Sequence, residues 1–280
     1  MSPVLTIAGV TIREAVRRKL LLAFLAVTAA MVALSAWGFD RLARTRSITG
    51  DEVHLALPQS FILFMFMFSF VLALSASTIG SPAVSWEIES GVLLTLVTRP
   101  VRRAQILLGK WLGLAVLLAL YDAAVCALEV AVVKAVSGFL PPDPLLVAVY
   151  LFAEGCLLLT VALLLSTRMS VIAAGVVAVA LFGASWLAGV VGALGQSFNI
   201  GALRAVGQVG RYVLPSDGLW HGAIYYLEPQ TFIGQHFLEV HAGDPFFAQS
   251  APSWAYLVWV GIWFLAVLGA GVASFERREL

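Results

Sequence analysis

Charged side chains are scarce in this sequence of 280 residues, because Asp, Glu, Lys and Arg together make up only 12%. Soluble domains carry about 25% of such residues. So few charges cannot cover a surface that faces water, which excludes a soluble globular enzyme. Cysteine is scarcer still: Cys126 and Cys156 both lie in apolar runs and form no disulfide or zinc framework. The net charge of +1 provides no basic field that would attract nucleic acid.

The sequence also lacks the motifs of a nucleotide-binding or hydrolytic site. Gly109-Lys110 precedes a tryptophan and has no earlier glycine at the spacing of a phosphate-binding loop. Neither a Gly-x-Ser-x-Gly elbow nor a His-Glu-x-x-His pair occurs. His236 and His241 have a spacing that suits one helical metal face poorly. We therefore predict no catalytic residue, metal or cofactor on this chain, and any transport by it needs an ion gradient or another subunit.

Hydrophobic residues, in contrast, make up 61% of the sequence, and the mean hydropathy is +0.95. They concentrate in six runs, and a membrane-spanning helix needs about 20 mainly apolar residues. The runs are residues 20–39, 61–84, 106–133, 145–166, 171–194 and 256–275. Because lipid offers the backbone no hydrogen-bond partner, each run must be helical. The sequence thus predicts an all-α polytopic membrane protein with one transmembrane domain over residues 1–280.

An even number of spans places both termini on one side of the membrane. Counting Lys and Arg in the flanks favours the cytoplasm for that side, with eleven basic residues inside and six outside. Arg41, Arg44 and Arg46 weaken this bias, because they fall outside. An alternative is a signal peptide cleaved near residues 33–36, which would leave five spans. Its charged region would be unusually long and would contain Glu14, so we expect the first span to remain.

Three segments outside the spans predict further elements. Residues 1–19 indicate either a helix lying in the cytoplasmic interface or an extension of the first span. Residues 195–254 form a long, aromatic-rich extracytoplasmic segment, which we expect to fold into short helices over the outer mouth. Residues 85–103 are expected to be cytoplasmic and are amphipathic. A short helix held there parallel to the membrane by two spans would be a lever, because a cytoplasmic partner could push it and so move the spans. A solvated loop is the alternative for this segment.

The pattern within residues 85–103 defines the faces of that lever. Its apolar stripe would consist of Trp86, Leu93 and Leu96. Its polar positions would be Glu87, Glu89 and Arg99, and it would stop at Pro100.

Acidic residues lie unexpectedly deep in two spans. Asp122, Cys126 and Glu129 share one face of the third span, and Glu154 lies near the middle of the fourth. An ionised carboxylate at that depth costs about 2.5–3.5 kcal/mol, so these groups must avoid lipid. They either line a substrate path for cationic or polar-headed cargo, or are protonated or hydrogen-bonded between spans.

Two apolar patterns are also informative. Phe64, Met65 and Phe68 belong to an adaptable wall in the second span, for which lipid is a more natural neighbour than greasy cargo. In the fifth span, Ser185 and Gly189 are spaced as two small residues that allow close helix contact, within the bundle or across a dimer, and so are Ala188 and Gly192.

Several passages, taken in order, resemble the type-2 permeases of ATP-binding-cassette (ABC) exporters, the ABC-2-type family. Residues 13–18 resemble the entry helix of that family, residues 87–91 and 98–110 its cytoplasmic signature, 163–168 its fourth-to-fifth junction, and 275–280 its ending. Val92 departs from the pattern, because a small polar residue is more usual after Gly91. The mid-membrane acids are a second departure, and they leave the cargo open.

The resemblance implies a permease subunit in the cell membrane of a prokaryote, with two ABC ATPase subunits that bind ATP and Mg. It implies a second permease copy, most simply in a homodimer, and an accessory protein outside is compatible with it. Residues 85–103 would be the coupling helix: Glu87 and Glu89 would meet basic groups of the ATPase, and Arg102, Arg103 and Lys110 would anchor it at lipid headgroups. The implied coupling residues are Trp86, Glu87, Glu89, Gly91, Leu93, Leu96, Arg99, Pro100, Arg102, Arg103 and Lys110.

Two other functions remain open at this point. A secondary transporter would be driven by protons through Asp122 and Glu154. A membrane anchor would recruit an ATPase without moving any solute.

Overall fold

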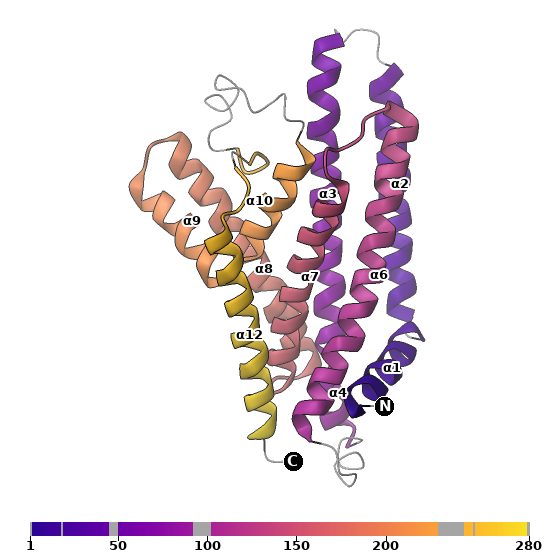
Figure 1. The fold of residues 1–280 in the computed structure, drawn as a ribbon, viewed down its shortest axis with the longest axis vertical. Coiled ribbons are helices and arrows are strands. Elements are labelled where there is room, and N and C mark those ends of the chain that lie inside the picture. Colours follow the sequence, from indigo (N-terminus) through magenta and orange to yellow (C-terminus); the bar gives the residue numbers. More distant parts are fainter. Residues whose placement is uncertain are drawn as a thin grey trace.

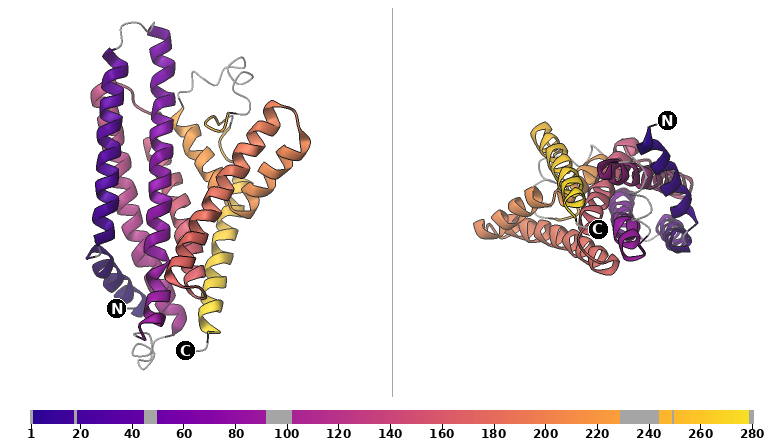
Figure 2. Two further views of the ribbon diagram at one scale, coloured as in Figure 1. Left: turned by 180° about the vertical axis from the view of Figure 1, so that it is seen from behind. Right: turned by 90° about the horizontal axis from the view of Figure 1, so that it is seen from below.

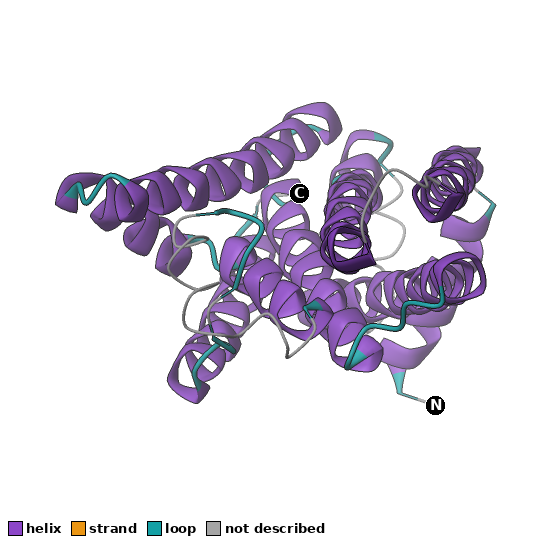
Figure 3. Ribbon diagram, turned by 90° about the horizontal axis from the view of Figure 1, so that it is seen from above, coloured by secondary structure: helices purple, strands orange, loops and turns teal. Residues whose placement is uncertain are grey.

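The computed structural model describes residues 2–17, 19–44, 50–91, 102–228, 244–248 and 250–278. Within these ranges every regular element is a helix (Figures 1 and 3). The helices are α1 (Pro3–Val16), α2 (Lys19–Arg44), α3 (Gly50–Gly80), α4 (Pro82–Glu89), α6 (Arg103–Ser137), α7 (Pro144–Ser166), α8 (Val171–Ser197), α9 (Gly201–Val213), α10 (Ser216–Leu227) and α12 (Trp254–Glu276).

All six predicted spans are confirmed as helices long and apolar enough to cross a membrane. They correspond to α2, α3 with α4, α6, α7, α8 and α12, and the chain is a multi-pass membrane protein. Local signals set several boundaries. Gly138 ends α6 in the left-handed conformation, with φ of +74°. Ser170 and Ser253 cap α8 and α12 through their hydroxyls.

Helix α7 forms the centre of the bundle and packs against α3, α6, α8, α10 and α12. Its side chains Leu151, Leu157 and Leu158 are among the most deeply buried in the protein. Lipid tails are as apolar as leucine, so close van der Waals contact, rather than escape from water, favours this packing.

The aromatic wall of α3 faces the interior of this bundle. Met65 and Phe68 are each only 1% exposed, and the ring of Phe66 lies 5.2–5.5 Å from three aromatic rings of α8, α10 and residues 244–248. Phe64 is partly buried against the same core. The expectation that this wall faces lipid is therefore wrong. In the described part of α3, Leu63 and Met67 are the large side chains that point outward.

Both termini lie at the same end of the molecule, beside α4 (Figures 1 and 2). Helix α1 slants across this end and meets α2 at an angle, so α1 does not continue α2 as a straight helix. It crosses α6 closely: a methyl group on Gly109 would lie 2.7 Å from Cβ of Ile7. A similarly close approach joins α3 to α7, where a methyl group on Gly80 would lie 2.9 Å from Cβ of Ala162.

At the other end, α8 and α9 lean away from the bundle as an antiparallel pair (Figure 2). The small residues of α8 mark this contact, because a methyl group on Gly192 would lie 2.8 Å from Cα of Gly207 on α9. The close-contact prediction for the fifth span is thus confirmed within one chain.

The turn between α9 and α10 reaches far along α12. Trp263, ten residues into α12, donates from Nε1 to the carbonyl oxygen of Val213 at 2.9 Å. Tyr256 donates to the carbonyl of Pro215 at 3.1 Å. Since an α-helix rises about 1.5 Å per residue, the α12 residues that bond this turn lie roughly 3–14 Å along the helix from its start. The turn between α9 and α10 therefore lies beside the first half of the last span, so this segment does not only cover the outer mouth of the bundle.

Candidate functional site

Helix α4 is clamped to the bundle by a buried cation. Lys110, on α6, lies 2.5 Å from Oε1 of Glu87 and donates to the carbonyl of Ala83 at 2.5 Å. The side chains of Lys110 and Glu87 are only 8% and 16% exposed. Both ends of this ion pair belong to the same chain, so α4 is fixed to α6 before any partner binds.

A serine fixes the opposite side of α4. Ser85 is buried, and its hydroxyl lies 2.9 Å from the carbonyl oxygens of both Ser166 and Met169, in the turn between α7 and α8. Helix α4 is separated from α3 by the single residue Ser81, because α3 ends at Gly80 and α4 begins at Pro82. Three spans (α6, α7 and α8) thus meet α4 within two of its turns.

One face and the C-terminal end of α4 are exposed. Trp86 is 55% exposed, and Glu89 is also exposed. Gly91 follows with φ of +73°, a conformation that glycine adopts without the strain a side chain would bring. Residues 92–101 lie outside the described residues, and with them the predicted positions Leu93, Leu96, Arg99 and Pro100. The described helix spans Pro82–Glu89, so it begins before residue 85.

The roles predicted for three charged residues need correction. Lys110 does not reach lipid headgroups, because Glu87 and Ala83 hold it inside the protein. For the same reason Glu87 is not available to a basic group of a partner. Arg103 is also engaged within the chain: its guanidinium donates to the carbonyl of Arg278 at 2.6 Å and to two carbonyls at the end of α12.

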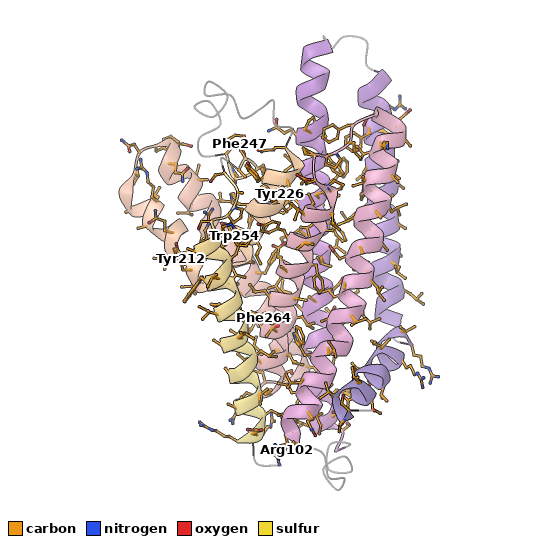
Figure 4. The ribbon with its side chains drawn as sticks, in the orientation of Figure 1. Arg102, Tyr212, Tyr226, Phe247, Trp254 and Phe264 are labelled. Atoms are coloured by element: carbon orange, nitrogen blue, oxygen red, sulfur yellow. The ribbon has the colours of Figure 1, made fainter. Side chains whose placement is uncertain are left out.

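These arginine contacts join the start of α6 to the end of the chain. The last carbonyl groups of a helix have no hydrogen-bond partner within it and carry partial negative charge, which a guanidinium neutralises. The adjacent Arg102 forms the N-terminal boundary of α6, where its backbone N–H donates to Oε1 of Gln105 at 3.1 Å. It is exposed at the lower end of α6 (Figure 4).

The three membrane acids are all buried, each at 2% exposure. Glu129 accepts a hydrogen bond from Ser35 of α2 at 2.8 Å, and Glu154 accepts one from Ser69 of α3 at 2.8 Å. Asp122 accepts from the thiol of Cys126 at 3.7 Å, one turn along α6. Each carboxyl group therefore has a partner in the protein, and two of them join neighbouring spans.

This arrangement brings the acids into the bundle interior. Two cavities of the described residues, one beside α9 and one beside α4, are lined by other residues. Glu129 and Glu154 contact different helices, α2 and α3. The geometry favours the hydrogen-bonded interpretation, and the substrate-path role of Asp122, Cys126, Glu129, Glu154, Phe64, Met65 and Phe68 stays a prediction. Within the described ranges, no three His, Cys, Asp or Glu residues gather in a way that could hold a metal ion.

The site that most clearly links separate spans is thus the clamp of Lys110, Glu87 and Ser85. Sequence reasoning singled out Glu87 and Lys110 but not Ser85. It did not predict their contacts, since Glu87 and Lys110 lie 23 positions apart, with one proline and two glycines between them.

Comparison with known proteins identifies the group to which this architecture belongs. No curated protein matches the sequence. The sequence pattern of one family, described as ABC-2 family transporter protein, matches residues 5–280. The match includes all six spans, the α4 clamp and the segment of α9 and α10. The chain therefore belongs to the ABC-2 family of transporter proteins.

Proposed function

We propose that this chain is the membrane-spanning permease subunit of an ABC exporter driven by ATPase subunits on separate chains. Two ATPase copies would bind ATP and Mg, and a second permease copy would complete the channel as a homodimer. The termini and α4 would face the cytoplasm of a prokaryotic cell. Membership of the ABC-2 family supports the permease role. The clamp of α4 supports the driven role, and it is the observation on which this proposal depends.

A coupling element must meet two physical requirements. It must expose a surface to the partner, and it must transmit a displacement to the spans without yielding. The exposed face of α4 that carries Trp86 and Glu89 meets the first requirement. The bonds of Lys110 and Ser85 meet the second, because they fix α4 to α6 and to the α7–α8 turn.

ATP binding would act through this element by favouring one packing of the bundle over another. A partner shifts such an equilibrium only by the difference in its affinity for the two states. Closure of the ATPase pair would displace both copies of α4 and tilt α6 and α7 together. Packed helices shift as units rather than bending continuously. A small movement at α4 would therefore reopen the bundle toward the other side of the membrane.

The decisive experiment measures ATP hydrolysis by the purified complex in lipid nanodiscs. Trp86→Ala and Glu89→Lys should each lower permease-stimulated hydrolysis at least fivefold while the permease still inserts. Trp37→Ala and Asp143→Lys are matched controls, because these residues are exposed and lie on α2 and just before α7, away from α4. Full stimulation in both α4 variants would refute the coupling role. Steady uphill transport by the permease alone would instead establish a secondary transporter.

A further inference from the structure

A cavity of about 510 Å³ lies at the end of the molecule opposite α4, between α8, α9 and α10 and the residues Asp244, Phe247, Ala248 and Ser250. That volume falls within the range of small-molecule sites. Figure 4 places Phe247, near one end of this cavity, above Tyr212 of α9. The polar residues of its lining include Gln196, Arg204, Gln208, Arg211, Asp217 and His221.

Helix α9 turns its polar face toward the protein interior and its apolar face outward, which is the reverse of the arrangement in a soluble protein. Arg204, Gln208 and Arg211 recur at the spacing of one helical face and line the cavity. The apolar residues Val206 and Val209 are exposed on the outside of the molecule. An apolar exterior with a polar interior suits a helix that separates lipid from a water-filled space. The depth of the α9–α10 turn beside α12 agrees with this placement.

The floor of the cavity holds an ion pair between a buried carboxylate and a half-exposed guanidinium that has unused donors. Nε of Arg211 lies 3.7 Å from Oδ2 of Asp217, whose side chain is 3% exposed. Nδ1 of His221 lies 3.5 Å from the same oxygen. Oδ2 of Asp217 accepts no hydrogen bond from the described residues. Among those residues, the terminal nitrogens of Arg211 also have no partner, so they remain available to a ligand.

A second guanidinium lies nearer the outer end of α9. Arg204 contacts neutral groups only, the side-chain oxygen of Asn199 and the carbonyl of Gly195. No carboxylate of the described residues neutralises its charge. The other acidic residue of the lining, Asp244, accepts a hydrogen bond from the backbone of Phe246 at 2.8 Å. The cavity therefore presents two arginines on one helix face, roughly 10 Å apart along α9.

We propose that this cavity binds a ligand through an anionic oxygen group, a phosphate or a carboxylate, held by Arg211 with Arg204. Guanidinium groups bind such oxyanions through paired hydrogen bonds. The carboxylate of Asp217 attracts the Nε side of the Arg211 guanidinium at 3.7 Å, which leaves the terminal nitrogens for the ligand. The group can belong to a free solute or to a lipid headgroup that enters past α9. This inference does not depend on the ATPase, because binding at the cavity needs no coupling through α4.

The test uses the full chain in two arms. In the first, calorimetry measures binding of glycerol 3-phosphate to the protein in neutral detergent. In the second, native mass spectrometry counts phosphatidylglycerol molecules retained from nanodiscs that also contain phosphatidylcholine. Arg211→Gln and Arg204→Gln should each weaken binding at least tenfold or release one lipid. Lys134→Gln is the matched control, because this exposed residue lies near the outer end of α6, away from the cavity lining.

A further variant separates ligand binding from folding. Arg211→Gln leaves Asp217 buried without its cation, so Arg211→Gln combined with Asp217→Asn removes both charges together. We expect the double variant to regain thermal stability but not binding. An arginine-dependent signal in the first arm identifies a free solute, and one only in the second identifies a headgroup. Recovery of binding in the double variant, or an equal loss in Lys134→Gln, would overturn the proposal, as would no arginine-dependent signal in either arm.

Discussion

Removal of the Lys110 ammonium group should reveal how firmly α4 is held. In Lys110→Met the side chain keeps its apolar stem but leaves Glu87 without its cation and the Ala83 carbonyl without its donor. Breaking one side of a fully buried ion pair costs about 3–5 kcal/mol. The 16% exposure of Glu87 and an adjacent water-sized void of about 30 Å³ allow partial hydration. We therefore expect a loss of about 2–3 kcal/mol in the free energy of unfolding.

The assay is a double-mutant cycle, measured by reversible unfolding in mixed detergent micelles. Glu87→Gln combined with Lys110→Met should recover much of the loss, because no unpaired charge then remains. The expected coupling energy between the two positions is about 1–3 kcal/mol. The same variants should lose stimulated ATP hydrolysis when reconstituted with the ATPase, since α4 would no longer be fixed to α6. If the two single effects simply add, the pair does not hold α4 and the reasoning fails.

Three other changes test separate parts of the structure. Gly192→Ala places a methyl group against the α9 backbone and should cost about 1–3 kcal/mol by thermal unfolding, whereas Gly183→Ala, which meets open space, should not destabilise. Burial, followed by the charge of Asp244, raises the pKa of Glu228 to about 8, so the folded protein holds this proton more tightly than the unfolded chain. Stability should therefore fall as pH rises from about 4.5 to about 8, and Glu228→Gln should reduce that slope in pH-dependent melting curves. Glu154→Gln keeps an acceptor for its serine partner and should retain ATP-driven transport in vesicles, so abolished transport by a folded variant would favour a proton path.

The spans could be predicted from sequence because hydropathy and length alone decide whether a helix can cross a membrane. The inward direction of Met65 and Phe68 could not, since lipid and neighbouring helices are equally apolar and leave no difference in the residue pattern. The same limit applies to Gly192, whose spacing indicated a close contact but not the partner helix. By contrast, Arg204, Gln208 and Arg211 recur at helical spacing, and this signal could have revealed the polar face of α9.

The pairing of Glu87 with Lys110 could not be predicted from the sequence for a different reason. Both residues lie at the α4 end of the bundle, where charged side chains usually reach water or headgroups, and the sequence gives no distance between α4 and α6. Only the packing of α4 beneath three spans makes the site dry enough for an internal ion pair. The sequence thus indicated which residues matter at this end, but not whether each turns toward a partner or toward its own chain.

Helix α8 joins the clamp at α4 to the cavity at the opposite end. Its first turns pack on the α3–α4 junction, where a methyl group on Gly175 would lie 3.2 Å from Oγ of Ser81. Its other half forms a wall of the cavity, with Gly189 leaving room for the carboxylate of Asp217. A helix of 27 residues spans about 40 Å, so a small tilt at α4 moves the cavity wall by a larger distance. The ligand site proposed at α9 and the driven element proposed at α4 are therefore mechanically connected through one continuous helix.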